Sequence, residues 1–244
     1  MSSKPDTTNN WSDHVSLFRM SCLTSLGKSM LPPGFWGDAS SNGANNGTAS
    51  SGTLYLTFDD GPNPNTTPGL LEILKEENVP ATFFLIGQQI ARHKELAVQM
   101  VQNGHQVGNH SYQHEFMPGM PLKRIQEEVD STNSLLDEIT NNSAPKLFRP
   151  PYGILDNRTA QYLKQAGMSI VYWTIVPEDW QRVGAARIVE RVTKNLSAGS
   201  VIVLHEGSSI AEQTLTATRE IIKRAKDRGY EFGHIPTESL AKSA

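Results

Sequence analysis

Beyond residue 52, short apolar runs alternate with longer segments in which apolar residues recur three or four positions apart. The short runs predict strands covered on both faces, because a strand with one solvent face would alternate between apolar and polar residues. The longer segments predict helices with one buried face. We expect strands at 53–58, 81–87, 105–110, 146–150, 168–173 and 200–205, and helices within 67–79, 95–104, 121–140, 156–166, 185–196 and 211–228.

The segment 121–140 has the clearest helical pattern. A proline occupies its first position, where a helix needs no backbone N–H. Apolar residues recur along one face, which we expect to be buried: Leu122, Ile125, Val129, Leu136 and Ile139. At the end of the preceding helix, Gly104 has the place of a C-terminal cap.

This alternation of strands and helices predicts an α/β domain in which helices cover a parallel sheet. At least six strand and helix units within about 190 residues favour a (β/α) barrel over an open sheet. In such a barrel the carboxyl ends of the strands form one rim, and the active site lies there. Polar residues at the strand ends are therefore the first candidates for function.

The first 52 residues differ in composition from the rest. Residues 37–52 are mainly Gly, Ser, Asn and Ala, with no aliphatic side chain larger than Ala, which predicts a flexible linker. Residues 1–36 form a tail with scattered apolar positions. Two readings of the tail stay open: a short amphipathic helix docked on the main domain, or no role at all. We place the main domain at 53–244.

Charge, hydropathy and cysteine content argue against several protein classes. A formal net charge of −3 and an isoelectric point near 6.2 supply no basic field for nucleic acid. No apolar run reaches the roughly 18 residues of a membrane-spanning helix. The single cysteine, Cys22, permits no intrachain disulfide. The N-terminal residues do not resemble a secretory signal, so we expect a cytoplasmic protein, with an exported or envelope protein as the alternative for a trimmed form.

The run YLTFDDGPNPNTTPG, residues 55–69, ends a strand with two adjacent acids. The carboxylates of Asp59 and Asp60 repel one another unless a cation lies nearby. Because successive side chains of a strand point in opposite directions, one acid can bind a metal while the other stays free as a base. A plain surface turn is the alternative.

The run HSYQH places His110 and His114 four residues apart. On a helix or a tight turn, this spacing brings both imidazoles within reach of one metal ion. Two solvated loop histidines are the alternative for this pattern alone. Asp60 could complete the ligand set, and two histidines with one carboxylate leave positions for water, as a catalytic site requires.

Further charged residues lie at or beyond the later strand ends. Arg149, in FRPPYG, could keep Asp59 ionised, or could form an ordinary surface salt bridge. His205, in VIVLHEG, is either a satisfied strand-end residue or a proton donor. An acid such as Asp179, in PEDW, would raise the pKa of that histidine.

Together, TFDDG, HSYQH, RPPYG, PEDW and IVLH resemble, in order and approximate spacing, the motifs of carbohydrate esterase family 4, the polysaccharide deacetylases. The resemblance covers about residues 53–236. It implies a distorted (β/α) barrel that removes acetyl groups from N-acetylated sugars with the help of a metal ion. It also implies these roles: Asp59 as general base, Asp60, His110 and His114 as metal ligands, Arg149 to orient Asp59, the backbone N–H of Tyr152 as oxyanion donor, His205 as general acid tuned by Asp179, and Trp180, Leu204 and Pro151 in the substrate pocket.

Two positions depart from the family pattern, Val176 and Glu206, where many relatives have Asp. Neither replaces a ligand, a base or an acid. The resemblance implies zinc, with cobalt or another transition metal as the alternative. It implies a poly- or oligosaccharide of N-acetylglucosamine, of the chitooligosaccharide or peptidoglycan type, as the substrate. An O-acetyl esterase of the acetylxylan type and a non-catalytic carbohydrate-binding barrel are the alternatives, and the oligomeric state stays open.

Overall fold

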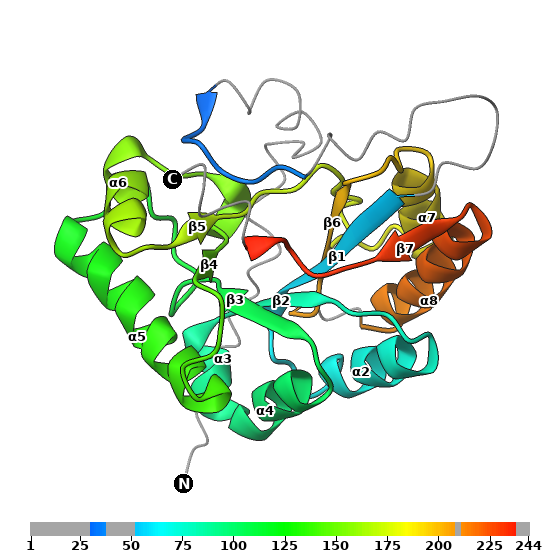
Figure 1. The fold of residues 1–244 in the computed structure, drawn as a ribbon, viewed down its shortest axis with the longest axis horizontal. Helices are drawn as coiled ribbons and strands as arrows, with labels where there is room; N and C mark the ends of the chain where they lie inside the picture. The colour runs from blue at the N-terminus through cyan, green and yellow to red at the C-terminus, as the bar shows by residue number, and fades with distance from the viewer. Residues whose placement is uncertain (1–29, 38–51, 208–210, 238–244) are drawn as a thin grey trace, which may run out of the picture.

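The structure, a computed structural model, describes residues 30–37, 52–207 and 211–237. Its centre is a parallel sheet of seven strands in the order β5-β4-β3-β2-β1-β6, with β7 paired to the start of β1 (Figure 1). The strands are β1 (Gly52–Gly61), β2 (Thr82–Leu85), β3 (Gln106–Asn109), β4 (Leu147–Phe148), β5 (Ser169–Ile170), β6 (Val201–His205) and β7 (Tyr230–Phe232). The predicted parallel α/β sheet is confirmed, and β7 is an addition to it.

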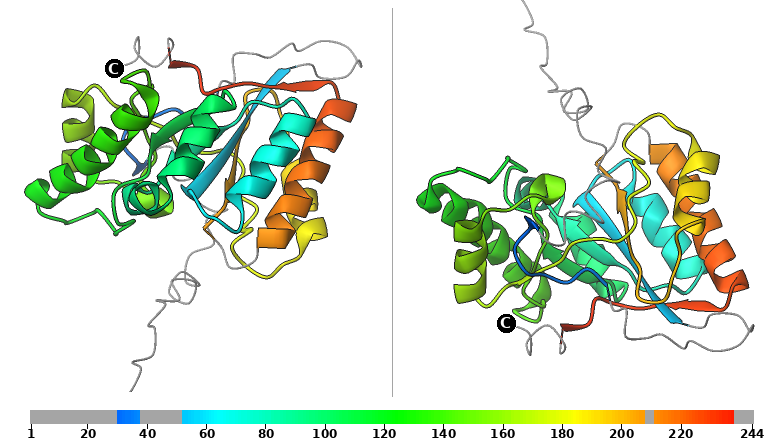
Figure 2. Two further views of the ribbon diagram at one scale, coloured as in Figure 1. Left: turned by 90° about the horizontal axis from the view of Figure 1, so that it is seen from below. Right: turned by 90° about the horizontal axis from the view of Figure 1, so that it is seen from above.

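Helices surround the sheet on three sides (Figures 1 and 2). They are α2 (Thr67–Glu76), α3 (Gly87–Arg92), α4 (Lys94–Gln102), α5 (Leu122–Thr140), α6 (Asn157–Gln165), α7 (Ala185–Thr193) and α8 (Ala211–Asp227), with a short 3-10 turn η4 (Pro151–Gly153). All six predicted helices are present, and Gly104 follows α4 with a φ of +81°, as its capping place predicts. None of the described helices has the length and apolarity that a bilayer crossing needs.

One position of the α5 face was predicted incorrectly. Ile125, Val129, Leu136 and Ile139 are buried, but Leu122 is 39% exposed. Leu122 is the first residue of the helix, directly after Pro121. The apolar periodicity therefore starts one turn later than the sequence suggests.

The barrel closes through an irregular segment that follows β5. Val171 forms a bridge with Phe35, and Ile175 forms a bridge with Ile202 of β6. The backbone N–H of Val203 donates to the carbonyl oxygen of Ile175 at 3.0 Å. A single short stretch thus carries the wall from β5 across to β6, which makes the barrel a distorted one.

Part of the predicted tail lies in this wall. The N–H of Phe35 donates to the carbonyl of Ile170 at 2.8 Å, and the N–H of Tyr172 donates to the carbonyl of Phe35 at 2.8 Å. Trp36 stacks on Tyr172 with ring centroids 4.3 Å apart. Residues 30–37 therefore pack as an extended segment along the side that the helices leave open (Figure 1). The predictions for 1–29 and for 38–51 lie outside the described residues.

Alternation along β1 and β6 separates two apolar layers. Leu56 and Phe58 belong to the large core between the sheet and the helices, together with Leu204. Residues that point the other way, such as Val201 and Val203, pack with Trp173 in the barrel interior. The interior layer carries the side chains described next.

Candidate active site

Polar side chains from four strands meet at one end of the sheet. Asp59 and Asp60 lie at the end of β1, and His110 directly follows β3. Arg149 follows β4, and His205 is the last residue of β6. Because the strands are parallel, these positions share the carboxyl rim of the barrel, as predicted. The register of β1 and β6 makes Asp59 and His205 direct cross-strand partners.

Asp60, His110 and His114 form a compact group whose potential ligand atoms all lie within 4.8 Å of one another. Oδ1 of Asp60 is 3.5 Å from Nε2 of His110 and 3.4 Å from Nε2 of His114. The pairing of β1 with β2 shifts register between Asp59 and Gly61, and Asp60 has a φ of +74°. Because of this irregularity, and not through simple alternation, the side chain of Asp60 points to the two histidines while that of Asp59 points to Arg149.

The conformation of the HSYQH run is a tight turn. Ser111 and His114 both have positive φ values, of 63° and 59°. The N–H of His114 donates to Oγ of Ser111 at 3.0 Å, which closes the turn. The turn brings the two imidazoles together, with ring centroids 4.9 Å apart.

The chemistry of this group fits a divalent transition metal. Nδ1 of His110 lies 2.7 Å from the carbonyl oxygen of Arg149. A carbonyl only accepts, so Nδ1 carries the proton and Nε2 keeps its lone pair for a metal. Oδ1 of Asp60 is buried and has no hydrogen-bond partner within the described residues. Such an oxygen, next to two imidazole nitrogens, is an orphan that a cation would satisfy.

The protonation states of these ligands agree with metal binding. Burial lowers the pKa of His114 to about 4, although Asp60 acts in the opposite direction. Its ring is therefore neutral near pH 7, with a lone pair available. Burial by itself would raise the pKa of Asp60, but His114 and His110 outweigh burial and hold that pKa well below its usual range. Asp60 is thus a carboxylate at neutral pH.

Arg149 is fully buried and holds Asp59 in place. Its Nη1 donates to Oδ1 of Asp59 at 2.7 Å and to Oγ1 of Thr57 at 2.7 Å. Its Nε and Nη2 donate to the carbonyls of Val171 and Tyr172 at 3.3 and 3.1 Å. The other oxygen of Asp59, Oδ2, lies 3.9 Å from Nε2 of His110. One carboxylate oxygen of Asp59 is therefore anchored, and the other faces the candidate metal group.

The buried Asp179 and the partly buried His205 form a second pair. Oδ1 of Asp179 is 2.9 Å from Nδ1 of His205, and Oδ2 accepts the backbone N–H of His205 at 2.7 Å. Burial lowers the pKa of His205, but Asp179 more than offsets it, and that pKa rises to about 9. The imidazole is thus protonated at neutral pH, and Nδ1 is held by the acid. Trp180 packs edge-on against it, with ring centroids 4.8 Å apart.

Two further predicted residues lie beside the histidines. Tyr152 belongs to the turn η4, has a φ of +59°, and places its ring 4.8 Å from the ring of His114. Pro151, the residue before it, is buried in the same turn. The left-handed conformation of a non-glycine residue is uncommon and is typical of functional turns.

Leu204 is the one predicted pocket residue that the structure does not bring to the site. It is fully buried on the helix side of β6, facing away from His205, because neighbouring strand residues point in opposite directions. Val203 packs instead in the interior cluster against which Trp180 lies. Val203, and not Leu204, is therefore the β6 residue on the pocket side. Because residues two apart on a strand share a face, the position of His205 in the sequence already indicates Val203.

Glu206, one of the two departures, lies beneath the acidic turn. Its side chain is fully buried, Oε2 accepts from Oγ1 of Thr67, and Oε1 has no partner among the residues that the structure describes. A Cβ at Gly61 would lie only 1.5 Å from Oε1, so Gly61 is required for this packing. Burial raises the pKa of Glu206 to about 8, and Asp60 and Asp59 act in the same direction. The other departure, Val176, is buried with Trp173.

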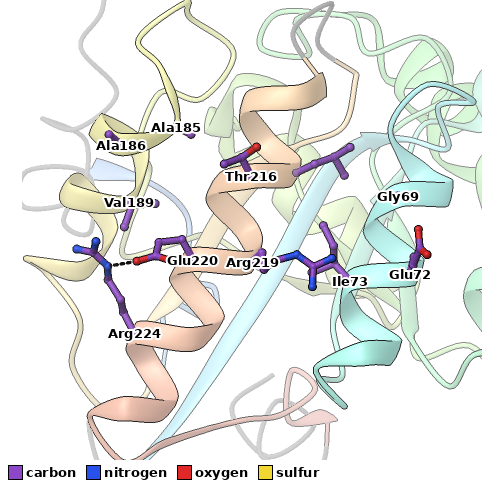
Figure 3. A pocket seen from close by; sticks show the side chains of 11 residues that line it. Gly69, Glu72, Ile73, Ala185, Ala186, Val189, Thr216, Arg219, Glu220 and Arg224 are labelled. Atoms are coloured by element: carbon purple, nitrogen blue, oxygen red, sulfur yellow. Dashed lines mark hydrogen bonds and ion pairs between the residues drawn. The ribbon is translucent and has the colours of Figure 1, made fainter.

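A hollow on the outside of the barrel is separate from this site. It lies between α2, α7 and α8, and its lining includes Ile73, Val189 and Arg219 (Figure 3). Arg224 donates to Glu220 at its edge. None of the residues that line it belongs to the metal group, to the Asp59 and Arg149 pair, or to the Asp179 and His205 pair.

Comparison with known proteins gives consistent matches. The sequence model of the family described as polysaccharide deacetylase matches residues 46–171, more than half of the chain. A chitooligosaccharide deacetylase of Bradyrhizobium sp. (strain ANU 289) is 35% identical over 76% of this chain and 91% of its own length. A peptidoglycan-N-acetylglucosamine deacetylase of Bacillus cereus is 33% identical over 73% of this chain and 84% of its own. The family 4 carbohydrate esterase of Streptomyces lividans, solved with acetate, is 31% identical, with a TM-score of 0.71 over 78% of this chain and 95% of that one.

Proposed function

Because the chain belongs to the polysaccharide deacetylase family, we propose that it removes N-acetyl groups from oligo- or polysaccharides of N-acetylglucosamine, releasing acetate. The relatives supply the substrate class, since they act on chitooligosaccharides and on peptidoglycan. One observation carries the proposal: Asp59 and His205 are cross-strand partners beside the Asp60, His110 and His114 group. A base, an acid and a metal site thus meet at one rim.

For the metal we propose zinc, because two imidazole nitrogens and one carboxylate oxygen form a typical ligand set of catalytic zinc. Asp60, His110 and His114 would hold the ion. When bound, a zinc ion supplies a water of lowered pKa and polarises the acetamide carbonyl. Cobalt or another transition metal is the alternative that the add-back experiment below distinguishes.

The protein's own groups then perform the proton transfers. Oδ2 of Asp59 accepts a proton as water attacks the carbonyl carbon, and the bond from Arg149 to Oδ1 holds the carboxylate so that Oδ2 faces the metal group. The backbone N–H of Tyr152 donates to the oxyanion that forms. Nε2 of His205 gives its proton to the amide nitrogen as the C–N bond breaks, while Asp179 holds Nδ1. The products are acetate and a free amine, and Trp180, Pro151 and Val203 line the pocket for the acetyl methyl group.

The test is acetate release from chitopentaose, N-acetylated peptidoglycan and acetylxylan by metal-stripped enzyme, before and after addition of zinc or cobalt. Metal-restored release from either N-acetylated substrate would support the proposal, and the ratio between the two would name the substrate class. Release from acetylxylan alone would replace it by an O-acetyl esterase. No release from any of the three, with metal bound, would favour a carbohydrate-binding barrel.

Asp59→Asn is the matched control for this experiment. The variant keeps the three metal ligands, and it should bind zinc normally but release acetate roughly 100-fold more slowly or worse, as the loss of a general base requires.

The cytoplasmic location stays a prediction, which fractionation of cells that produce the protein would check.

A further inference from the structure

A large apolar side chain lies exposed beside the site. Phe116 is 54% exposed, and among the described residues only Met30 and Leu122 are comparably exposed large apolar side chains. A single exposed apolar residue needs no explanation by itself. Phe116 needs an explanation because it lies in the segment between the proposed ligand His114 and α5.

Phe116 is linked to the metal ligands through ring contacts. Its ring centroid lies 6.2 Å from that of Tyr152, with the planes tilted by 52°. The ring of Tyr152 in turn lies 4.8 Å from that of His114. The ring of Tyr152 therefore connects the exposed ring of Phe116 to His114 of the metal group.

The segment that carries Phe116 is fixed on both sides. Upstream, Oε2 of Glu128 accepts the N–H groups of Tyr112 and Gln113 at 2.9 and 2.7 Å. Downstream, Met117 is fully buried, and its carbonyl accepts the N–H of Met120 at 3.0 Å. The backbone around Phe116 is thus anchored while its ring stays in solvent. A ring held in this way loses little conformational freedom when a ligand covers it.

We propose that Phe116 is a stacking platform for a sugar ring that neighbours the N-acetylglucosamine unit under attack, so that it selects oligomers over short substrates. This inference rests on the proposed function. The apolar C–H face of a pyranose would cover the exposed aromatic ring and remove both from water. Because this contact is made equally before and during the reaction, it should lower KM and leave kcat nearly unchanged.

The test compares kcat and KM for chitopentaose and for N-acetylglucosamine, which has no neighbouring ring, in the wild type, Phe116→Ala and Phe116→Trp. We expect Phe116→Ala to lower kcat/KM for chitopentaose by about 3- to 10-fold through KM, with little change for the monosaccharide, and Phe116→Trp to restore it. Met30→Ala, which removes another exposed apolar side chain, should leave kcat and KM unchanged for both substrates. Equal losses on both substrates, or no loss at all, would overturn the platform.

Calorimetric binding of chitopentaose to the zinc-loaded proteins separates this inference from the proposed reaction. Chitopentaose binding that is weakened in Phe116→Ala, with no acetate release from chitopentaose or from N-acetylated peptidoglycan, would keep the platform and overturn the deacetylase proposal. Acetate release from chitopentaose with equal affinity in the wild type and Phe116→Ala would overturn the platform alone. Absence of chitopentaose binding by the wild type would overturn the platform, and it would overturn both proposals if N-acetylated peptidoglycan also released no acetate.

Discussion

Nδ1 of His110 lies 2.7 Å from the carbonyl oxygen of Arg149, so the backbone of Arg149 orients a proposed metal ligand. The side chain of the same residue holds the proposed base, Asp59, at 2.7 Å. Arg149 therefore supports the metal group through its backbone and the base through its side chain. A substitution removes only the side chain, so the contact with Asp59 can be lost while the contact of the backbone carbonyl with His110 is kept.

Arg149→Met should weaken the base and spare the metal. The variant leaves the buried carboxylate of Asp59 without its cation, so we expect the free energy of unfolding to fall by about 3–5 kcal/mol. Acetate release should fall strongly, whereas zinc affinity should stay within about tenfold of the wild type because the carbonyl remains. Urea denaturation and zinc titration measure the two effects. Arg158→Met, at an exposed arginine, is the control, and a zinc loss as large as the loss of activity would contradict the division.

His114→Ala should remove the metal and keep the fold. The side chain of His114 is 24% exposed, so its removal opens no deep cavity in the core. Zinc affinity should fall by roughly 100-fold or more, because even residues behind metal ligands contribute 10- to 100-fold. Zinc content after dialysis is the measurement, and His93→Ala, between α3 and α4, is the matched control. Retention of one zinc with unchanged affinity would remove His114 from the ligand set.

Asp179→Asn should move the alkaline limb of the pH–rate profile. Asp179 raises the pKa of His205 to about 9, so its neutralisation lowers that pKa and the acid form is lost at lower pH. Activity near pH 8 should therefore decline much more than activity near pH 6. The profile of kcat from pH 5.5 to 9.5 tests this, with Asp227→Asn on the surface as the control. An alkaline limb at the wild-type position would mean that another group donates the proton.

Glu206 should make the metal-free protein less stable as pH rises. Its pKa of about 8 in the folded protein exceeds the unfolded value of 4.5, so the folded state binds the extra proton between these values. The free energy of unfolding contributed by this group therefore falls from about pH 4.5 to pH 8, by on the order of a few kcal/mol. Glu206→Gln should flatten this part of the curve.

His205 contributes in the same direction over a later window. Its pKa is raised from 6.5 to about 9, so its stabilisation is complete below pH 6.5 and is lost as pH rises through 9. Chemical denaturation of wild type and Glu206→Gln at pH 5, 6.5 and 8 isolates the glutamate, and Glu72→Gln on the surface is the control. Parallel curves for the wild type and Glu206→Gln would contradict the assignment.

Local pattern predicted the strands, most helices and the residues at the strand ends, because these depend on neighbours in sequence. Residues 30–37 were not predicted as part of the barrel, since the pairing of Phe35 with Val171 spans more than a hundred residues. The helix α3 was missed because its sequence, GQQIAR, has a single large apolar residue, Ile90. The family resemblance implies Leu204 for the pocket, but alternation along β6 turns Leu204 toward the helices and Val203 toward the interior.

The cross-strand pairing of Asp59 with His205 joins parts of the chain that are made at different times. The three proposed metal ligands all precede residue 115, whereas Asp179 and His205 belong to the last third of the sequence. A nascent chain therefore carries every proposed ligand before it carries the proposed acid. Because the two sets of residues are separate along the chain, a substitution of Asp179 or His205 alone would leave the three ligands unchanged and remove the proposed proton donor.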